Sequence, residues 1–337
     1  MQIDFYTTCI DNYWDLGFSF HLASSLWYYY PEMHIRYFCD NKKLFLKLLG
    51  ASTIKNLTYY DLKEIKNTQP AKMIFNFFDR KIDFEYLHSF AYPIRLINFS
   101  YVLMHTWVER LHNTSYISKN IHISHFIPSL MKNTWWILIN PSQKIYKNQI
   151  QKNILWEIRR QWFPSFSTEV YKKKWVSLFC YHKTFESIKN ELLKYQDTLF
   201  FVFDHQYKWE NIIQMPFLSL EEYYKFLYVC DQNIVRWENS FMESLWTWKP
   251  FLWDIYKESN EAHKEKIHDF SMYLTSHFWN IFWEYIQIYK DFNLWKEKEA
   301  LWQFLHYENN FEIITKETLI EKDVITNIWY LFWDSSL

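Results

Sequence analysis

Two carboxylates stand four residues apart directly after the first apolar run of the chain. Asp11 and Asp15 lie in the segment 11–17, DNYWDLG, which follows the strand-like run 3–9. In open α/β sheets, loops at the carboxyl ends of the strands carry the ligand chemistry, so this pair could hold a nucleophile and accept its proton. One of the two could equally cap the helix that follows. The pattern by itself does not favour either of these two interpretations.

A second candidate site is a strand that ends in arginine and opens into a helix. Residues 235–241 read VRWENSF, and we expect a helix from Ser240. A guanidinium beside the N–H groups of a helix N-terminus forms a ready site for a pyrophosphate. The alternative interpretation is a surface ion pair between Arg236 and Glu238.

Short apolar runs separated by helical segments must position these groups. The runs typical of strands are 3–9, 34–39, 73–77, 94–98, 121–127, 175–180, 198–203, 233–236 and 251–254. Between them we expect a helix after the polar loop 11–17, a helix 42–49 that ends at Gly50, and helices 185–195, 220–229 and from 240. The remainder of the chain is mainly helical. Strands that alternate with helices predict parallel sheets.

The alternation occurs twice, with a mixed, polar stretch from about 141 to 174 between the two occurrences. We therefore assign 1–150 to an N-terminal Rossmann-like domain, 151–174 to a linker, 175–320 to a C-terminal Rossmann-like domain and 321–337 to a C-terminal helix. Two successive units of this kind form the architecture that binds a nucleotide-sugar in the cleft between them.

Composition excludes several classes of function. The net charge of the 337 residues is −1, so no basic field indicates a nucleic-acid partner. The four cysteines show no C-x-x-C spacing, which argues against a metal site or a disulfide framework. The N-terminus lacks a signal-peptide pattern, and the aromatic stretch 278–289 is too short to span a bilayer. We expect a soluble, cytoplasmic protein.

Glycine is almost absent. At the usual frequency of about 7%, a chain of this length holds roughly 24 glycines, whereas this chain has 2, beside 19 tryptophans. Turns and close backbone approaches require glycine. A two-domain enzyme with only Gly17 and Gly50 is therefore physically unusual.

Taken together, the motifs resemble one family, the elongation factor P arginine rhamnosyltransferases. That family carries D-N-[FY]-G-D-[IL]-G near its start and R-G-E-D-S-F, A-G-K-P-F and W-x-I-Y…A-H in its second half. The corresponding stretches keep their order here: 11–17, 107–109 with His112, 126–138, 177–181, 216–220, 235–241, 247–251, 253–256 and 262–263.

The resemblance implies a GT-B type fold of two facing Rossmann-like domains with a mainly helical C-terminus. The domain 1–150 would bind the protein acceptor, 175–320 the nucleotide-sugar, and 321–337 would cross back toward the first domain. The implied reaction transfers L-rhamnose from dTDP-β-L-rhamnose to an arginine side chain of elongation factor P, with inversion at the sugar carbon. No metal or other cofactor is implied, and no nucleic acid or membrane is expected as a partner.

On the acceptor side, Asp15 matches the base of the family and Asp11 its partner carboxylate. The implied donor-binding residues are Tyr181, Phe217, Arg236, Glu238, Asn239, Ser240 and Tyr256. Tyr181 and Phe217 would contact the thymine and Tyr256 the phosphates, while Arg236 would stabilise the departing diphosphate. Two departures from the family pattern concern the donor side and not the catalytic pair: Asn239 replaces a family acid, and Leu220 replaces a glutamine.

The resemblance also accounts for the missing glycines. Trp14, Trp135, Trp136, Trp237 and Trp248 fall where the family has glycine, whereas Trp107, Trp246 and Trp253 fall where the family itself has tryptophan. The economical explanation is a gene in which UGA encodes glycine but has been read as tryptophan. The alternative is a lineage with real tryptophans at these turns.

Two rival functions stay open. One is a GT-B enzyme that uses another donor or acceptor, which would keep Asp15 and Arg236 but fail with elongation factor P. The other is a catalytically inactive protein that only binds elongation factor P, which is favoured if the five tryptophans are real. The codons at those five positions discriminate between the interpretations.

Overall fold

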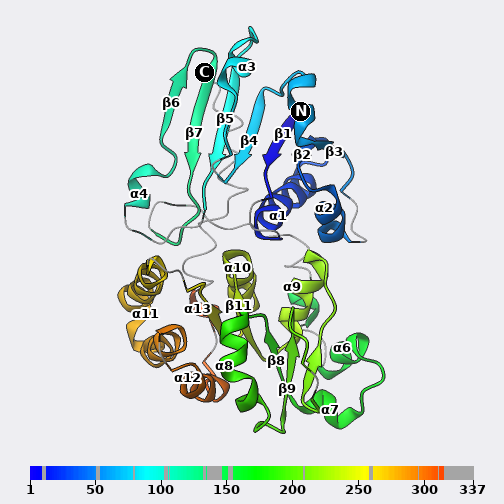
Figure 1. Cartoon of the computed structure of the whole chain (residues 1–337), viewed down its shortest axis with the longest axis vertical. Helices are drawn as coiled ribbons and strands as arrows, with labels where there is room; N and C mark the ends of the chain where they lie inside the picture. The colour runs from blue at the N-terminus through cyan, green and yellow to red at the C-terminus, as the bar shows by residue number, and fades with distance from the viewer. Residues whose placement is uncertain are drawn as a thin grey trace. The chain divides into compact units, whose positions relative to one another are not determined.

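The structure is a computed structural model that divides the chain into two compact units, Met1–Pro141 and Ser142–Ile320. Figure 1 shows a β-sheet with helices beside it in each unit. We treat each unit by itself. The residues that the structure describes are 1–9, 13–50, 54–78, 80–101, 105, 107–131, 134, 146–150, 155–207, 209–257, 261–294, 296–309 and 311–314. The predicted C-terminal helix 321–337 lies outside them.

The first unit is built on a seven-stranded sheet with the order β3-β2-β1-β4-β5-β7-β6. Every pair is parallel except β6 with β7, which is antiparallel. The strands are β1 (Gln2–Thr7), β2 (His34–Cys39), β3 (Leu57–Asp61), β4 (Met73–Phe77), β5 (Ile94–Phe99), β6 (Ser115–Ser118) and β7 (Ile121–Phe126). The five runs predicted as strands in this half are therefore confirmed, and β3 and β6 were missed.

The helices of this unit are α1 (Tyr13–Tyr29), α2 (Lys42–Leu49), η1 (Leu62–Asn67), α3 (Phe84–His88) and α4 (Val108–Leu111). The predicted helix 42–49 is confirmed, and it ends at Gly50, whose φ of 58° lies in the left-handed region. The prediction of a polar loop through 17 was wrong, because α1 begins at Tyr13 and carries Asp15 in its first turn. Carboxylates are favoured at that end of a helix, where the backbone N–H groups point outward.

The core of the first unit is largely aromatic. Phe5, Phe75, Phe77 and Phe99 lie on three adjacent strands and are fully buried. The rings of Phe77 and Phe99 stack with their centroids 4.9 Å apart. Parallel sheets bury both faces, which is why their strands are continuous apolar runs and can be recognised in the sequence.

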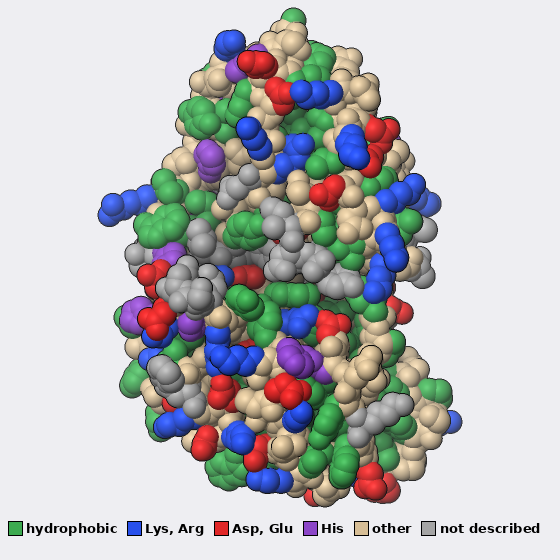
Figure 2. All heavy atoms as spheres, in the orientation of Figure 1, with side chains coloured by type: hydrophobic (Ala, Val, Ile, Leu, Met, Phe, Trp, Pro, Cys, Tyr) green, Lys and Arg blue, Asp and Glu red, His purple; other side chains and the backbone are tan. Residues whose placement is uncertain are grey.

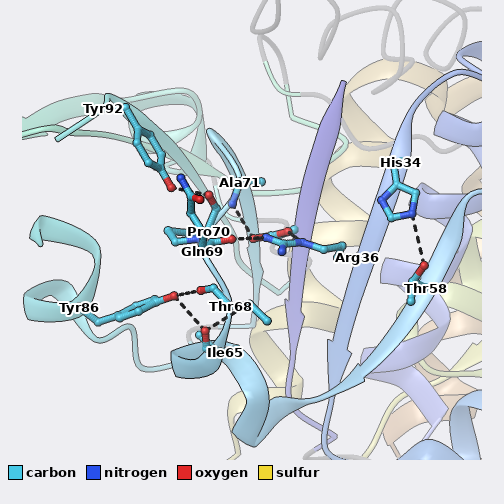
Figure 3. A network of polar contacts seen from close by, with 11 residues as sticks. His34, Arg36, Thr58, Ile65, Thr68, Gln69, Pro70, Ala71, Tyr86 and Tyr92 are labelled. Carbon is cyan, nitrogen blue, oxygen red and sulfur yellow. Dashed lines mark hydrogen bonds and ion pairs between the residues drawn. The ribbon is translucent and has the colours of Figure 1, made fainter. Parts of the chain in front are cut away.

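A buried ion pair joins the middle of this sheet to the segment before β4. Arg36 on β2 forms two 2.7 Å hydrogen bonds to the carboxylate of Asp4 on β1. The N–H of Ala71 donates to the same carboxylate, and Arg36 also donates to the carbonyl of Gln69 (Figure 3). Burial raises the pKa of Asp4, and the hydrogen bond from Arg36 opposes that shift. Both charges are compensated, as buried charges must be.

The second unit contains a wholly parallel five-stranded sheet with the order β10-β9-β8-β11-β12. Its strands are β8 (Lys174–Leu178), β9 (Thr198–Val202), β10 (Ile212–Gln214), β11 (Gln232–Arg236) and β12 (Phe251–Asp254). The four strands predicted in this half are confirmed, with ends that differ by at most two residues, and β10 was missed.

The helices around this sheet are α6 (Leu155–Trp162), α7 (Thr168–Lys172), α8 (His182–Leu192), α9 (Leu220–Val229), α10 (Glu238–Thr247), α11 (Ala262–Leu294), α12 (Glu297–Leu305) and α13 (Glu312–Ile314). The mainly helical C-terminal part is confirmed by α11 and α12, which pack together. Among the described residues no helix is both long and apolar enough to cross a bilayer.

The described part of the segment 151–174 belongs to the second unit and does not form a separate linker. Arg159 of α6 shows why. Its buried guanidinium donates to the carbonyls of Val229 and Tyr171 and forms a 2.7 Å ion pair with Asp231. An arginine that bonds to the last residue of α9, to a carbonyl of α7 and to the acid just before β11 ties its helix to the sheet.

Charge is mixed over the face of the molecule shown in Figure 2, where acidic and basic side chains are interspersed. No extended basic stripe follows either unit on that face. This distribution agrees with the net charge of −1.

Candidate functional site

Four parallel strands of the second sheet end at one edge, and polar groups gather there. Arg236 and Asp254 are the last residues of β11 and β12 and are register partners. Because their Cα atoms are paired in a parallel ladder, their side chains leave the sheet on the same face. The connection from β8 to α8, residues 179–181, follows the neighbouring strand at this edge.

Arg236 is held by both polar and aromatic groups. Its Nη2 forms a 2.6 Å ion pair with Asp204, which follows β9, and its Nη1 donates to the carbonyl of Cys180 at 3.2 Å. The guanidinium carbon lies 4.2 Å from the ring centre of Phe179 and 5.4 Å from that of Tyr181. Its buried Nε has no hydrogen-bond partner among the described residues. An arginine with a fixed plane and a remaining donor is suited to a phosphate.

The peptide group between Cys180 and Tyr181 is hydrogen-bonded at both its carbonyl and its N–H. Its carbonyl accepts from Arg236 and, at 3.0 Å, from Nε2 of His205. Its N–H donates to the carboxylate of Asp254 at 2.7 Å. The second oxygen of Asp254 accepts from the hydroxyl of Thr184 at 2.9 Å, so the carboxylate is also bonded to a side chain in the first turn of α8.

Two groups at this edge have pKa values shifted from their ordinary values. Asp254 is 1% exposed, and burial raises its pKa to about 7, although the bonds from Tyr181 and Thr184 and the charges of Lys257 and Arg236 favour the ionised form. Burial lowers the pKa of His205, whose ring stacks on that of Phe185 with the two centroids 4.3 Å apart. Perturbed groups of this kind gather at functional sites.

Aromatic side chains flank the arginine on the outside. The rings of Tyr181 and Tyr256 meet edge to face with centroids 5.2 Å apart. Tyr256 follows β12 and is 60% exposed. Phe217 is 38% exposed in the connection from β10 to α9. An exposed ring is a surface on which a flat base can stack.

The remaining predicted donor residues are in the first turn of α10. Glu238 is its first residue and forms a 3.0 Å ion pair with Lys266 of α11. Asn239 is partly buried and Ser240 is buried. The predicted alternative of an Arg236–Glu238 pair is not what the structure shows, since each side chain has a different charged partner.

In the first unit, Asp15 is fully buried. Its backbone carbonyl accepts from the hydroxyl of Ser19 at 2.9 Å, and that hydroxyl lies 2.5 Å from the hydroxyl of Tyr37 on β2. Asp15 is therefore placed on a helix that is bonded to the sheet. Asp11, its predicted partner, lies outside the described residues.

Two of the five suspect tryptophans have glycine-like backbones. Trp237 has φ 62° and ψ 150°, and Trp248, at the C-terminus of α10, has φ 63° and ψ 2°. The first combination is adopted almost only by glycine, and the second is the usual conformation of a C-cap glycine. Trp107, at a position where the family has tryptophan, has an ordinary φ of −66°. Trp135 and Trp136 lie outside the described residues.

Sequence reasoning missed Asp204, His205, Thr184 and Asp254. Asp254 ends β12 just as Arg236 ends β11, so the rule that parallel strands converge at their carboxyl ends could have found it. The other three depend on contacts between distant segments and carry no local signal. Within the described ranges, no three His, Cys, Asp or Glu side chains are grouped as a metal site requires.

Curated relatives match a short stretch of the chain. A protein-arginine rhamnosyltransferase of Pseudomonas aeruginosa is 39% identical over 56 residues, and one of Pseudomonas putida is 41% identical over 56 residues. Each stretch makes up 17% of this chain and 15% of the relative. The aligned stretch thus spans well under two thirds of these relatives' length.

Solved structures match nearly the whole chain. The structure described as "Structural basis for EarP-mediated arginine glycosylation of translation elongation factor EF-P" superposes with a TM-score of 0.61 and 14% identity over 99% of both chains. UDP-GlcNAc 2-epimerase from Methanocaldococcus jannaschii gives 0.53 and 10%, over 99% of this chain and 100% of the other. The predicted fold class, α/β of the GT-B type with a helical C-terminal part, is thereby confirmed.

A model of one protein family covers both units, over residues 3–207 and 192–328. It therefore includes the edge around Arg236 as well as the helix that carries Asp15. The chain belongs to the family of Elongation-Factor P (EF-P) rhamnosyltransferase EarP.

Proposed function

We propose that this protein transfers L-rhamnose from dTDP-β-L-rhamnose to an arginine side chain of elongation factor P, with inversion at the sugar carbon. The observation that carries the proposal is a family match across both units, combined with an arginine held at the carboxyl edge of the second sheet. The curated relatives bear the name protein-arginine rhamnosyltransferase. Because the acceptor is a translation factor, the proposed location is the cytoplasm.

The second unit would bind the donor. The Nη2 donor of Arg236 is bound to Asp204, whose side chain is 48% exposed, so an entering diphosphate can take the place of that carboxylate. The first turn of α10, with Glu238, Asn239 and Ser240, places helix N–H groups beside it. These groups would stabilise the departing diphosphate without a metal.

The aromatic residues Tyr181, Phe217 and Tyr256 would complete the donor site. Tyr181 and Phe217 are assigned to the thymine, and Tyr256 to the phosphates. The exposure of Phe217 supports its assignment, because a base can reach the ring, and the exposure of Tyr256 leaves that side chain accessible to a phosphate. The edge-to-face contact of Tyr181 with Tyr256 supports neighbouring roles along the donor.

The first unit would supply the base. A guanidinium has a pKa above about 12 and is a poor nucleophile while protonated. In the proposed step a guanidinium nitrogen forms the bond to C1 of rhamnose, the C1–O bond to dTDP breaks, and the proton on that nitrogen passes to Asp15. Asp11 would help to orient the guanidinium. Asp15 is fully buried, so the acceptor arginine must displace what covers it.

We further propose that positions 14, 135, 136, 237 and 248 are glycine in the functional protein. The positive φ values of Trp237 and Trp248 support this, because a left-handed conformation costs a residue with a Cβ about 1–2 kcal/mol. Of the three family tryptophans, none is among the described residues with positive φ. Codons other than UGA at these positions would refute this part of the proposal.

The test is a transfer assay with purified elongation factor P. The chain with glycine at the five positions is incubated with dTDP-β-L-rhamnose, and the acceptor is examined by mass spectrometry for one added deoxyhexose on an arginine. Acceptor with its reactive arginine changed to lysine serves as the control, and UDP-glucose and dTDP-glucose test the donor. A modified acceptor with another sugar, or none with rhamnose, would contradict the proposal.

A further inference from the structure

The carboxylate of Asp254 is buried and contacts a residue of the candidate donor site, but the proposed reaction gives it no role. It bonds to the Tyr181 N–H, while Arg236 bonds to the Cys180 carbonyl. These two atoms belong to one peptide group. That peptide is therefore fixed by an anion at its N–H and a cation at its carbonyl, supplied by the ends of two neighbouring strands.

We propose that Asp254 is a positioning residue of the donor site, which fixes the Cys180–Tyr181 peptide and, through it, the guanidinium of Arg236 and the ring of Tyr181. The inference rests on the proposed function, because it assumes that Arg236 and Tyr181 hold the nucleotide-sugar.

Geometry favours this role over simple anchoring of α8. Anchoring the helix needs only a bond to its first turn, and the bond to the Thr184 hydroxyl already provides one. The bond to Tyr181 does more. It sets the plane of the peptide whose carbonyl accepts from Arg236, and Arg236 lies against the rings of Phe179 and Tyr181. A rotation of that peptide would withdraw one acceptor from the guanidinium and turn the Tyr181 ring.

Protonation should weaken the hold on the peptide. An ionised carboxylate accepts a charge-assisted hydrogen bond from the Tyr181 N–H, whereas a protonated one has lost that charge, so the bond is weaker. Burial raises the pKa of Asp254 to about 7, so the change falls in the neutral range. The charged groups facing it are Arg236 on β11 and Lys257 after β12, and the Cys180 thiol stays neutral because its pKa is raised.

Another titrating group at the carbonyl end of this peptide is His205, and its pKa is lowered below the ordinary value of 6.5. Its Nε2 donates to the Cys180 carbonyl in either protonation state, so its titration leaves that bond in place. The donor itself is a diphosphate diester and keeps its charge through the neutral range. A change in donor affinity near pH 7 therefore points to Asp254.

The decisive experiment measures dTDP-β-L-rhamnose binding by calorimetry between pH 6 and 8, in the chain with glycine at the five positions. If only the ionised form binds, affinity should fall about tenfold from pH 8 to pH 6. Asp254→Asn should bind weakly and show no pH dependence. Thr184→Val keeps the Asp254 carboxylate but removes one hydrogen-bond donor to it. The midpoint of the pH dependence of donor binding should therefore move to higher pH.

Asp231→Asn is the matched control for a merely structural effect. Asp231 pairs with Arg159 and accepts from the N–H of Trp175, away from this edge. Its loss should lower the melting temperature and leave the pH profile of binding unchanged. A second readout needs no donor. In protein labelled with 15N-tyrosine, the Tyr181 amide signal should titrate with the same midpoint and stop titrating in Asp254→Asn.

The outcomes separate the two proposals. If the starting protein binds no dTDP-β-L-rhamnose at pH 8, the proposed donor is wrong and the inference falls with it. If it binds and Asp254→Asn keeps the same affinity and pH profile, the inference is overturned and the proposed function stands. A Tyr181 signal that does not titrate also overturns the inference, whatever the donor does.

Discussion

Replacing Asp254 with asparagine should change how the stability of the second unit depends on pH. The side chain is 1% exposed, and burial raises its pKa from 3.8 to about 7. An acid whose pKa rises on folding holds its proton more tightly in the folded state. Stability is therefore lost as the pH rises from the unfolded value toward the folded one. Asparagine has the same shape but no proton to lose, so the variant lacks this dependence.

The magnitude follows from the shift. Three units of pKa at 1.36 kcal/mol each amount to about 4 kcal/mol over the whole window, of which about 2 kcal/mol is lost between pH 5.5 and 8. For a unit of this size, 1 kcal/mol moves the melting temperature by about 2–4 °C. The melting temperature of Asp254→Asn relative to the unchanged protein should therefore rise by about 4–8 °C between pH 5.5 and 8.

Differential scanning calorimetry across that range is the assay. The asparagine also loses hydrogen bonds with Tyr181 and Thr184, but this loss is the same at every pH and shifts the two curves only by a constant. All other titrating groups are common to both proteins and cancel in the difference. Parallel curves would show that Asp254 keeps its ordinary pKa, and the reasoning from burial would be refuted.

Arg236→Ala should weaken dTDP-rhamnose binding at least tenfold in calorimetry, because the diphosphate loses a charge-assisted partner. Asp204→Ala should change that affinity by no more than about fivefold, which is the effect of a half-exposed ion pair. Equal losses of affinity in the two variants would contradict the assignment. Asp15→Asn should lower the single-turnover transfer rate 10²- to 10⁴-fold and leave donor binding intact; normal turnover would make Asp11 the candidate base. Trp248→Gly and Trp237→Gly should each raise the melting temperature, since about 1–2 kcal/mol of backbone strain is relieved. Trp253→Gly, at a buried strand position, should lower it by creating a cavity, and the same direction of change in all three variants would contradict the distinction.

The fold could be predicted where strands are buried on both faces. Runs such as 73–77 and 251–254 match β4 and β12 residue for residue, because every residue of these two strands is buried and most are apolar. The missed strands are β3, β6 and β10, which lie at the edges of their sheets. They are short or partly exposed, so they lack the continuous apolar signal. The start of α1 was misplaced because the helix begins inside the segment 11–17, DNYWDLG, whose Asp, Asn and Gly residues are typical of a loop.

The candidate site was predictable only in part. Arg236 could be found because a strand ending in arginine before a helix is a local pattern. Asp254 reaches a peptide 73 positions away in the sequence, and Asp204 reaches an arginine 32 positions away. Those contacts depend on the strand order β9-β8-β11-β12, which local periodicity does not determine. The roles of Asp11 and Asp15 stay predictions that rest on the family motif.

The ion pair between Arg236 and Asp204 makes ligand binding an exchange of anions. The arginine is already neutralised by a carboxylate at 2.6 Å, so an entering anion replaces a charged partner and not only water. A singly charged anion gains little from such an exchange, since it restores what it removes. A diphosphate brings two charges and several acceptor oxygens, so it can more than replace the carboxylate that it displaces. Asp204 thus turns a general anion site into one that discriminates by valence.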